Sequence, residues 1–315
     1  MSAARWSPAD IPSLVGTTAV VTGGNSGIGY HTALELARHG ATVTLAVRTP
    51  AKGEAAASRI RDSADGAQVR VARLDLGSLA SVRDFADAWE GPLGLLVNNA
   101  GLMTPPRYQQ TRDGFELQLG TNHLGHFALT GRLLPALLAA PAPRVVTVSS
   151  IAHHRGTPAV LDGNPAERYH PPTAYGNSKL ANVLFALELQ RRSTAAGASL
   201  TSTAAHPGVS ATNLVASEQG LGSAWVVRLL APLAMRVVVQ SATAGAEPTL
   251  YAATAAEPGS YTGPQGLRET RGRVGPARLS APATDETLAT TLWDLSEQLT
   301  SVRYDWEQVS PPRLG

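Results

Sequence analysis

A tyrosine and a lysine stand four residues apart in the segment Tyr175-Gly176-Asn177-Ser178-Lys179. In a helix this spacing places both side chains on one face. An unperturbed tyrosine has a pKa near 10, which is too high for a base at neutral pH. A nearby positive charge favours the phenolate, and lowering the pKa by two units takes only ~2.7 kcal/mol. Such a tyrosine could give a proton to a carbonyl or take one from an alcohol.

Two further residues could join this chemistry. Ser150 follows an apolar strand expected over 144–149 and could hold a substrate oxygen by a hydrogen bond. Asn122 falls inside a long helix expected over 115–138 and could hold a water that passes protons to Lys179. Taken singly, none of these features requires a catalytic role. A Tyr-x-x-x-Lys spacing, for example, often arises by chance on helices.

The segment Thr22-Gly23-Gly24-Asn25-Ser26-Gly27-Ile28-Gly29 follows an apolar strand and precedes a helical pattern over 27–39. A strand, a glycine-rich turn and a helix N-terminus form a common phosphate-binding arrangement, since the free N–H groups and the helix dipole favour an anion. The spacing Gly-x-x-x-Gly-x-Gly differs from the Gly-x-Gly-x-x-Gly dinucleotide fingerprint. A tight turn without a ligand is the alternative.

The residues at the ends of the next strands bear on the choice of nucleotide. Arg48 follows the strand over 41–47, where a carboxylate would favour NAD(H) and an arginine can meet the 2′-phosphate of NADP(H). NADP(H) is therefore the preferred cofactor, with Lys52 as a helper and NAD(H) as the alternative. Asp75 could accept a hydrogen bond from adenine or could cap a turn. Asn98 could brace neighbouring strands. The small Ala100 and Gly101 allow the backbone and a cofactor to approach each other closely.

Strands alternate with helices along the whole chain, which predicts an α/β fold with a doubly wound parallel sheet in a single domain. Ligands bind such sheets beyond the carboxyl ends of the strands, so the segments named above should line one crevice. A core over about 16–256 would be followed by a lid and C-terminal extension over 257–315. The less regular parts are a loop over 151–174, an apolar helical segment over 209–239, a short edge strand over 260–263 and a last helix over 284–299.

Composition excludes several classes of function. The 315 residues include no cysteine, which removes disulfides, thiol nucleophiles and cysteine–zinc sites. The net charge is +2 with scattered cations, so there is no nucleic-acid footprint. No metal site is expected, since His153 and His154 have no third ligand at a useful spacing. No signal peptide or membrane span is apparent, and a cytoplasmic protein is expected.

Taken together, these motifs resemble those of the short-chain dehydrogenase/reductase family. They occur in the same order as in the family, over roughly 18–255. The resemblance implies a Rossmann-type fold in which Tyr175 is the acid/base, Lys179 binds the nicotinamide ribose and lowers the tyrosine pKa, and Ser150 orients the carbonyl. Asn122 would complete the proton relay. It further implies pairing of subunits, as a homodimer or homotetramer, through the Tyr175 helix and its neighbour over 113–138. The cofactor residues it implies are Gly23, Asn25, Ser26, Gly27, Ile28, Gly29, Arg48, Asp75, Leu76, Asn98, Ala100, Gly101, Tyr175, Lys179, Pro207, Val209 and Thr212.

Finer features are similar to the branch of retinol dehydrogenases and protochlorophyllide reductases. They are Gly23-x-Asn25-Ser26-Gly27, Arg48, the run 121–127 and a long segment between Ser150 and Tyr175. We therefore expect carbonyl or alcohol chemistry on a hydrophobic small molecule. The substrate would be chosen by residues 103–108, 151–172, 214–239 and 258–273, with His153 and His154 as loop residues that could touch it. The alternatives are a non-catalytic NADP(H)-binding regulator and a C=C reductase.

Overall fold

The computed structural model describes residues 6–209 and 241–306, and its centre is one eight-stranded sheet. The strand order is β3-β2-β1-β4-β5-β6-β7-β8. All neighbours from β3 to β7 run parallel, and only β7 and β8 are antiparallel. The predicted doubly wound α/β fold is therefore confirmed. The strands are β1 Thr18–Thr22, β2 Thr42–Val47, β3 Val69–Arg73, β4 Leu95–Asn98, β5 Arg144–Val148, β6 Thr201–Ala205, β7 Tyr261–Gly266 and β8 Arg271–Pro276.

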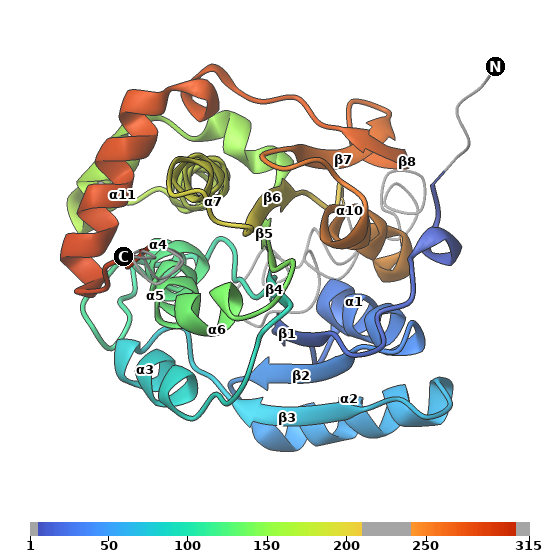
Figure 1. Cartoon of the computed structure of the whole chain (residues 1–315). Coiled ribbons are helices and arrows are strands. Elements are labelled where there is room, and N and C mark those ends of the chain that lie inside the picture. The colour runs from blue at the N-terminus through green and yellow to red at the C-terminus, as the bar shows by residue number, and fades with distance from the viewer. Residues whose placement is uncertain (1–5, 210–240, 307–315) are drawn as a thin grey trace, which may run out of the picture.

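Helices cover both faces of the sheet (Figure 1). One apolar cluster joins the strands to α1, α2 and α10, and two others join them to α3, α5, α7 and α11. Because both faces are covered, β1, β2 and β4 are buried on almost every position rather than on alternate ones. The helices are α1 Gly27–Arg38, α2 Pro50–Ser63, α3 Leu79–Asp87, α4 Leu117–Leu119, α5 Gly125–Arg132, α6 Leu134–Leu138, α7 Pro171–Ala195, α10 Ala242–Thr254 and α11 Glu286–Thr300.

The long helix expected over 115–138 is divided. A π-helical turn, η2 Gly120–Leu124, separates α4 from α5, and α6 starts with Pro135 in its first turn. Close packing explains the glycine at the start of α5, because a Cβ on Gly125 would lie 2.4 Å from the carbonyl oxygen of Leu76. The expected loop over 151–174 contains three short 3-10 helices before α7 begins. The apolar segment expected to be helical over 209–239 lies, from residue 210 on, outside the described residues.

The strand expected over 260–263 is present as β7, but its predicted place at the edge of the sheet was wrong. β7 lies between β6 and β8, and β8 forms the edge of the sheet. The sequence did not indicate β8, because its residues Arg-Gly-Arg-Val-Gly-Pro have no apolar alternation and include residue types that are rare in strands. Its pairing comes from the hairpin that Leu267–Thr270 close, where Leu267, Arg268 and Glu269 all have positive φ.

The C-terminal helix α11 lies against α7 and α5. Trp293 of α11 is buried and contacts the rings of Phe127, Phe185 and Tyr304, with centroids 4.5 to 5.9 Å apart. As a result, residues 122–131 and 176–186 are all buried within a single chain. The side chains of α5 and α7 that contact Trp293 are thus covered within one chain, whereas Arg191, Thr194 and Ala195 at the end of α7 are exposed.

Among the described helices, none combines the length and the apolar run that crossing a bilayer requires.

Candidate active site

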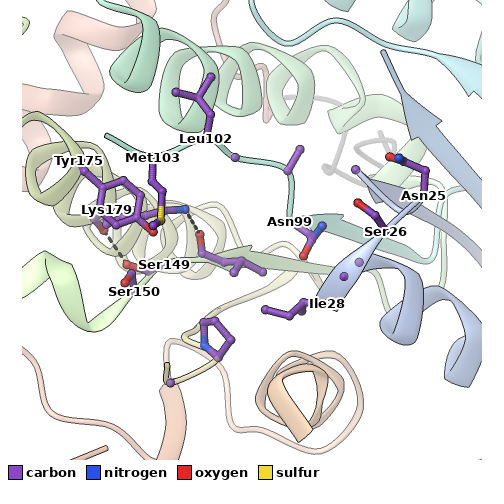
Figure 2. A pocket seen from close by; sticks show the side chains of 18 of the residues that line it. Asn25, Ser26, Ile28, Asn99, Leu102, Met103, Ser149, Ser150, Tyr175 and Lys179 are labelled. Carbon is purple, nitrogen blue, oxygen red and sulfur yellow. Dashed lines mark hydrogen bonds between the residues drawn. The ribbon is translucent and has the colours of Figure 1, made fainter. Parts of the chain in front are cut away.

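A cavity of about 430 Å³ opens at the carboxyl ends of β1, β4 and β5, within the range of small-molecule sites. Figure 2 shows Asn25, Ser26 and Ile28 on one side of it and Ser150, Tyr175 and Lys179 on the other. Most of the residues predicted from the sequence therefore lie in one place. The lining consists of Gly23, Asn25, Ser26, Gly27, Ile28, Gly29, Asn99, Ala100, Gly101, Leu102, Met103, Pro105, Leu117, Val148, Ser149, Ser150, Tyr175, Lys179, Pro207 and Gly208.

The glycine-rich turn fits a pyrophosphate. Gly23 and Gly27 have φ of +65° and +55°, a conformation that side chains other than glycine rarely adopt. A Cβ on Gly29 would lie 2.4 Å from Asn99 Nδ2 and 2.6 Å from the carbonyl oxygen of Gly23. Helix α1 begins at Gly27 after the extended Ser26, so its first N–H groups face the cavity side of the turn. The residues present therefore match a nucleotide cofactor in both shape and charge.

Asn99, which was not predicted, links the glycine turn to β4. Its backbone N–H donates to Thr22 Oγ1 at 2.9 Å, and its side-chain Nδ2 donates to the carbonyl oxygen of Thr22 at 2.8 Å. The bracing role that was expected of Asn98 thus belongs to Asn99. Asn98 is fully buried, donates to Thr130 Oγ1 of α5 at 3.0 Å and lies outside the cavity lining.

The residues predicted to hold the adenosine end lie at the same edge of the sheet but outside the cavity lining. Arg48 is exposed directly after β2. Asp75 Oδ1 accepts a hydrogen bond from the Gly77 N–H at 3.1 Å, so its carboxylate at least caps this turn. Leu76 is buried, and its backbone packs against Gly125 of α5. The cofactor roles of Arg48, Asp75 and Leu76 stay predictions.

Tyr175, Lys179 and Ser150 form the reactive end of the cavity. The Tyr175 hydroxyl and the Ser150 side chain are hydrogen-bonded, and Lys179 Nζ lies 5.8 Å from the centre of the Tyr175 ring. Lys179 Nζ also donates to the carbonyl oxygen of Val148 at 3.1 Å. The neighbouring Ser149 hydroxyl instead donates to the backbone oxygen of Lys179 at 2.7 Å. Ser150, and not its neighbour Ser149, is thus the serine that is hydrogen-bonded to the Tyr175 hydroxyl.

Burial dominates the electrostatics of this group. Burial raises the pKa of Tyr175, and its hydrogen bond with Ser150 opposes that rise. Burial also lowers the pKa of Lys179 to about 8. The lowered tyrosine pKa expected from the sequence is thus not produced by the protein groups alone. It would need the added positive charge of an oxidised nicotinamide beside the phenol.

Asn122 fixes the loop beside Lys179. Its Oδ1 accepts from the Leu102 N–H, and its Nδ2 donates to the Leu102 carbonyl and to Ser178 Oγ, at 2.9 to 3.0 Å. Both amide protons are therefore used, and the side chain can only accept further hydrogen bonds. A water held for Lys179 would have to donate to it, which is compatible with the predicted relay. The backbone oxygen of Asn122 faces His126 Nδ1 at 2.9 Å.

The loop after β6 was expected to hold the nicotinamide carboxamide. Pro207 and Gly208 line the cavity, but Val209 does not, and its N–H donates to the Thr270 carbonyl at 3.0 Å. That N–H is therefore already used within the protein. Thr212, the last residue of the predicted motif, lies outside the described residues.

One wall of the cavity is apolar and is held by polar contacts behind it. Leu102, Met103, Pro105 and Leu117 line it. The Thr104 N–H donates to Gln118 Oε1 at 2.7 Å, which fixes the loop that carries Met103. This wall could accept a hydrophobic substrate.

His153, suggested as a substrate contact, is instead fully buried behind Ser150. Its Nδ1 lies 2.9 Å from the Ser150 carbonyl oxygen. Among residues 6–209 and 241–306, no three His, Asp or Glu side chains gather as a metal site.

Comparisons with known proteins agree with this arrangement. A family model described as short chain dehydrogenase matches residues 17–221. Retinol dehydrogenase 12 of Homo sapiens is 42% identical over 299 residues, which cover 93% of this chain and 89% of that protein. Polyprenol dehydrogenase of Mus musculus is 44% identical over 257 residues, covering 79% of this chain and 75% of that protein. The crystal structure of an uncharacterised protein from Mycobacterium paratuberculosis shares 47% identity with a TM-score of 0.79, covering 96% of this chain and all of that one. The family match includes both the glycine-rich turn and the helix of Tyr175.

Proposed function

The chain belongs to the short-chain dehydrogenase family, and we propose that this oxidoreductase of alcohols and carbonyls uses NADP(H) on a hydrophobic small molecule, with Tyr175 as general acid/base. The observation that carries the proposal is the contact of the Tyr175 hydroxyl with Ser150, beside Lys179 and across the cavity from the glycine-rich turn. An acid/base and a hydrogen-bond donor thus face the place where a nicotinamide would lie.

The protein's part in the reaction is proton transfer and positioning. Ser150 Oγ holds the substrate oxygen, and the Tyr175 hydroxyl gives its proton to that oxygen in reduction or takes it in oxidation. The Lys179 ammonium stabilises the phenolate while the proton is away. The nicotinamide, when bound, supplies or accepts the hydride. The apolar residues Leu102, Met103 and Leu117 limit water at the reacting carbon.

The cofactor preference rests on Arg48. Arg48 is exposed and directly follows β2, which is parallel to β1, so Arg48 and the glycine-rich turn both follow the carboxyl ends of neighbouring strands. A guanidinium there could bind the 2′-phosphate of NADP(H) through charge-assisted hydrogen bonds. NAD(H) remains the competing cofactor.

The substrate class rests on two supports. The cavity lining includes the apolar residues Leu102, Met103, Pro105 and Leu117, and Figure 2 shows Met103 beside Tyr175 and Lys179. The relatives at 42% and 44% identity are named for retinol and polyprenol, both of which are apolar alcohols. A screen should therefore begin with long-chain and isoprenoid alcohols and the matching aldehydes.

Replacing Tyr175 with phenylalanine tests the mechanism. The variant keeps the ring and loses the proton, so turnover of a substrate identified with the wild type should fall by about 10²–10⁴-fold while NADPH still binds. Steady-state kinetics and fluorescence titration with NADPH measure the two effects. Near-normal turnover would rule out Tyr175 as the acid/base.

Tight NADPH binding by the wild type without turnover of any carbonyl in a broad panel would favour the non-catalytic regulator instead. Product analysis would reveal reduction of a C=C bond.

The cytoplasmic location and the homodimer or homotetramer expected from the sequence stay predictions. Because residues 122–131 and 176–186 are buried in one chain, we propose that any subunit contact uses surfaces other than these parts of α5 and α7.

A further inference from the structure

The hairpin of β7 and β8 ends in a turn with an unusual backbone. Leu267, Arg268 and Glu269 have φ of +44°, +56° and +63° in succession. Residues other than glycine seldom adopt this conformation, and a run of three must be held by contacts elsewhere. The turn is closed by the Thr270 N–H, which donates to the Gly266 carbonyl at 3.1 Å. A strained turn of this kind points to a use for the side chain that it positions.

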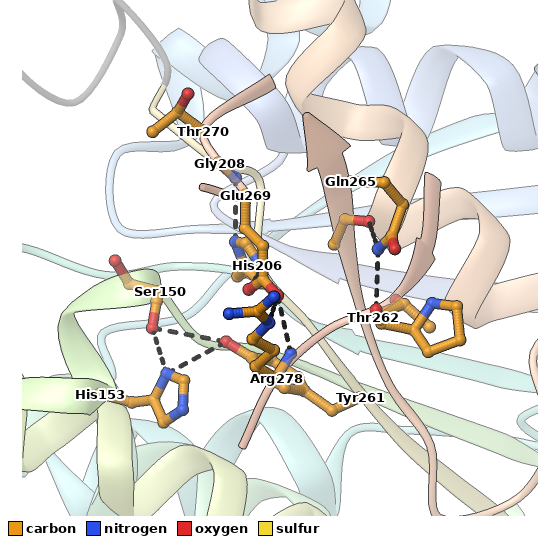
Figure 3. Close-up of polar contacts among 12 residues, drawn as sticks. Ser150, His153, His206, Gly208, Tyr261, Thr262, Gln265, Glu269, Thr270 and Arg278 are labelled. Carbon is orange, nitrogen blue, oxygen red and sulfur yellow. Dashed lines mark hydrogen bonds and ion pairs between the residues drawn. The ribbon is translucent and has the colours of Figure 1, made fainter. Parts of the chain in front are cut away.

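The side chain that this turn positions is Glu269, which reaches the loop after β6 (Figure 3). Its Oε2 lies 3.4 Å from Nε2 of His206, whose side chain is fully buried, while the Glu269 side chain is only 13% exposed. A second contact is made by the backbone, where the Val209 N–H donates to the Thr270 carbonyl at 3.0 Å. The hairpin tip therefore contacts both ends of the segment His206–Val209.

Neighbouring contacts define how His206 is held. The Gly208 N–H donates to His206 Nδ1 at 3.2 Å, so Nδ1 is an acceptor and the neutral ring carries its proton on Nε2, toward Glu269. Burial lowers the pKa of His206 to about 3, which agrees with a neutral ring. The ring lies directly on the backbone of Gly263 in β7, where a Cβ would come within 2.0 Å of Nε2.

The carboxylate of Glu269 is itself fixed. Its Oε1 accepts a hydrogen bond from the Arg278 N–H at 3.0 Å, and the Arg278 guanidinium Nε lies 4.0 Å away. One carboxylate oxygen is thus tied to the segment after β8 and the other faces His206. The contacts form a chain from Arg278 through Glu269 and His206 to the N–H of Gly208.

We propose that Glu269 and His206 are positioning residues that set the backbone of Pro207 and Gly208 against the nicotinamide. The inference rests on the proposed function, because it assigns a purpose to the loop that would face the nicotinamide end of NADP(H). Pro207 and Gly208 line the cavity, whereas His206 and Glu269 lie behind them. Loss of the contact between Glu269 and His206 should weaken binding of the nicotinamide half of the cofactor and leave binding of the adenosine half unchanged.

The test uses Glu269→Ala and Glu269→Gln in the full chain. Alanine removes the carboxylate. The near-isosteric glutamine keeps one oxygen for the Arg278 N–H but removes the charge that faces His206, and so covers the case in which the alanine variant folds poorly. Leu267→Ala is the matched control, because Leu267 lies in the same turn, has positive φ and is 59% exposed. Two measurements are made: affinity for NADPH against adenosine 2′,5′-bisphosphate, which lacks the nicotinamide, and amide hydrogen exchange of residues 206–209.

We expect at least about fivefold weaker NADPH binding in Glu269→Ala, unchanged binding of adenosine 2′,5′-bisphosphate and faster exchange at residues 206–209. Glu269→Gln should also weaken NADPH binding and speed exchange at these residues, but by less. Leu267→Ala should match the wild type in both measurements. Unchanged exchange in both Glu269 variants would overturn the inference, as would an equal loss of both ligands. A wild type that fails to bind NADPH would instead overturn the proposed function, and the exchange data would still decide whether the hairpin holds the loop.

Discussion

The cavity has two supports of different construction. One is the glycine-rich turn, where Gly23, Gly27 and Gly29 satisfy demands of the local backbone. The other is the β7–β8 hairpin, where the side chains of Tyr261 and Glu269 contact Ser150 and His206, which lie far away in the sequence. The glycine turn requires glycine at fixed positions close together in the chain, so it can be recognised as a sequence motif. The hairpin contacts use common residue types whose positions are set by the fold, so no motif marks them.

The hairpin also reaches Ser150. The Tyr261 hydroxyl lies 3.4 Å from the Ser150 carbonyl oxygen and 3.3 Å from His153 Nδ1. His153 Nε2 in turn accepts a hydrogen bond from the Ser280 N–H at 3.3 Å. Thus the segment 261–280 contacts the backbone of Ser150 as well as the loop of Pro207. The glycine turn is expected to hold the cofactor, whereas the hairpin aligns the groups around the reacting atoms.

The largest effect is expected from a change in the glycine turn. Gly29→Ala places a methyl group 2.6 Å from the Gly23 carbonyl oxygen, and backbone cannot yield as a side chain can. We expect about 100-fold weaker NADPH binding and a free energy of unfolding lower by roughly 1–3 kcal/mol. Fluorescence titration and urea unfolding measure these effects. Gly66→Ala is the control for NADPH affinity, since no atom would lie within 4 Å of its Cβ, while its positive φ makes the substitution strained at a site away from the turn. Wild-type affinity in Gly29→Ala would mean that the turn is not the phosphate site.

A smaller effect is expected from Arg48→Ala, which leaves the turn intact. Loss of a charge-assisted contact of about 1.5–3 kcal/mol should weaken NADPH binding by about 10- to 100-fold and leave NADH binding nearly unchanged. The ratio of the two dissociation constants is the measurement, with Arg83→Ala, an exposed arginine of α3, as the control. If NADPH loses no affinity relative to NADH, the assignment of NADP(H) is wrong.

The smallest effect is expected from the hairpin residue that acts on Ser150. Tyr261→Phe removes one hydroxyl, while the contact of His153 Nδ1 with the Ser150 oxygen remains. We expect kcat to fall about two- to fivefold, as for the loss of one neutral hydrogen bond, with the KM for NADPH unchanged. Tyr251→Phe in α10, whose ring packs on Trp6, serves as the control. A rise in the cofactor KM with kcat unchanged would place Tyr261 on the cofactor side and remove the distinction between the two supports.

The same contrast explains what could be predicted from the sequence. The strands expected over 41–47 and 144–149 match β2 and β5 to within one residue, because both are largely apolar and buried. Ser150, Tyr175 and Lys179 were found because their chemistry restricts residue type and spacing. Asn99 was missed since the pair Asn98-Asn99 does not reveal which amide faces the turn. The contact of Glu269 with His206 could not be predicted, because it depends on the turn before β8, a strand without a pattern of its own.

The packing of α11 on α7 also has a consequence for the order of synthesis. Helix α7 ends at Ala195 and α11 begins at Glu286, about ninety residues later. At a translation rate of roughly 5–20 residues per second, the apolar side of α7 that Trp293 will cover has no partner for several seconds. The helix that carries Tyr175 and Lys179 therefore becomes fully enclosed only when nearly the whole chain has left the ribosome, and until then its apolar surface is open to chaperones.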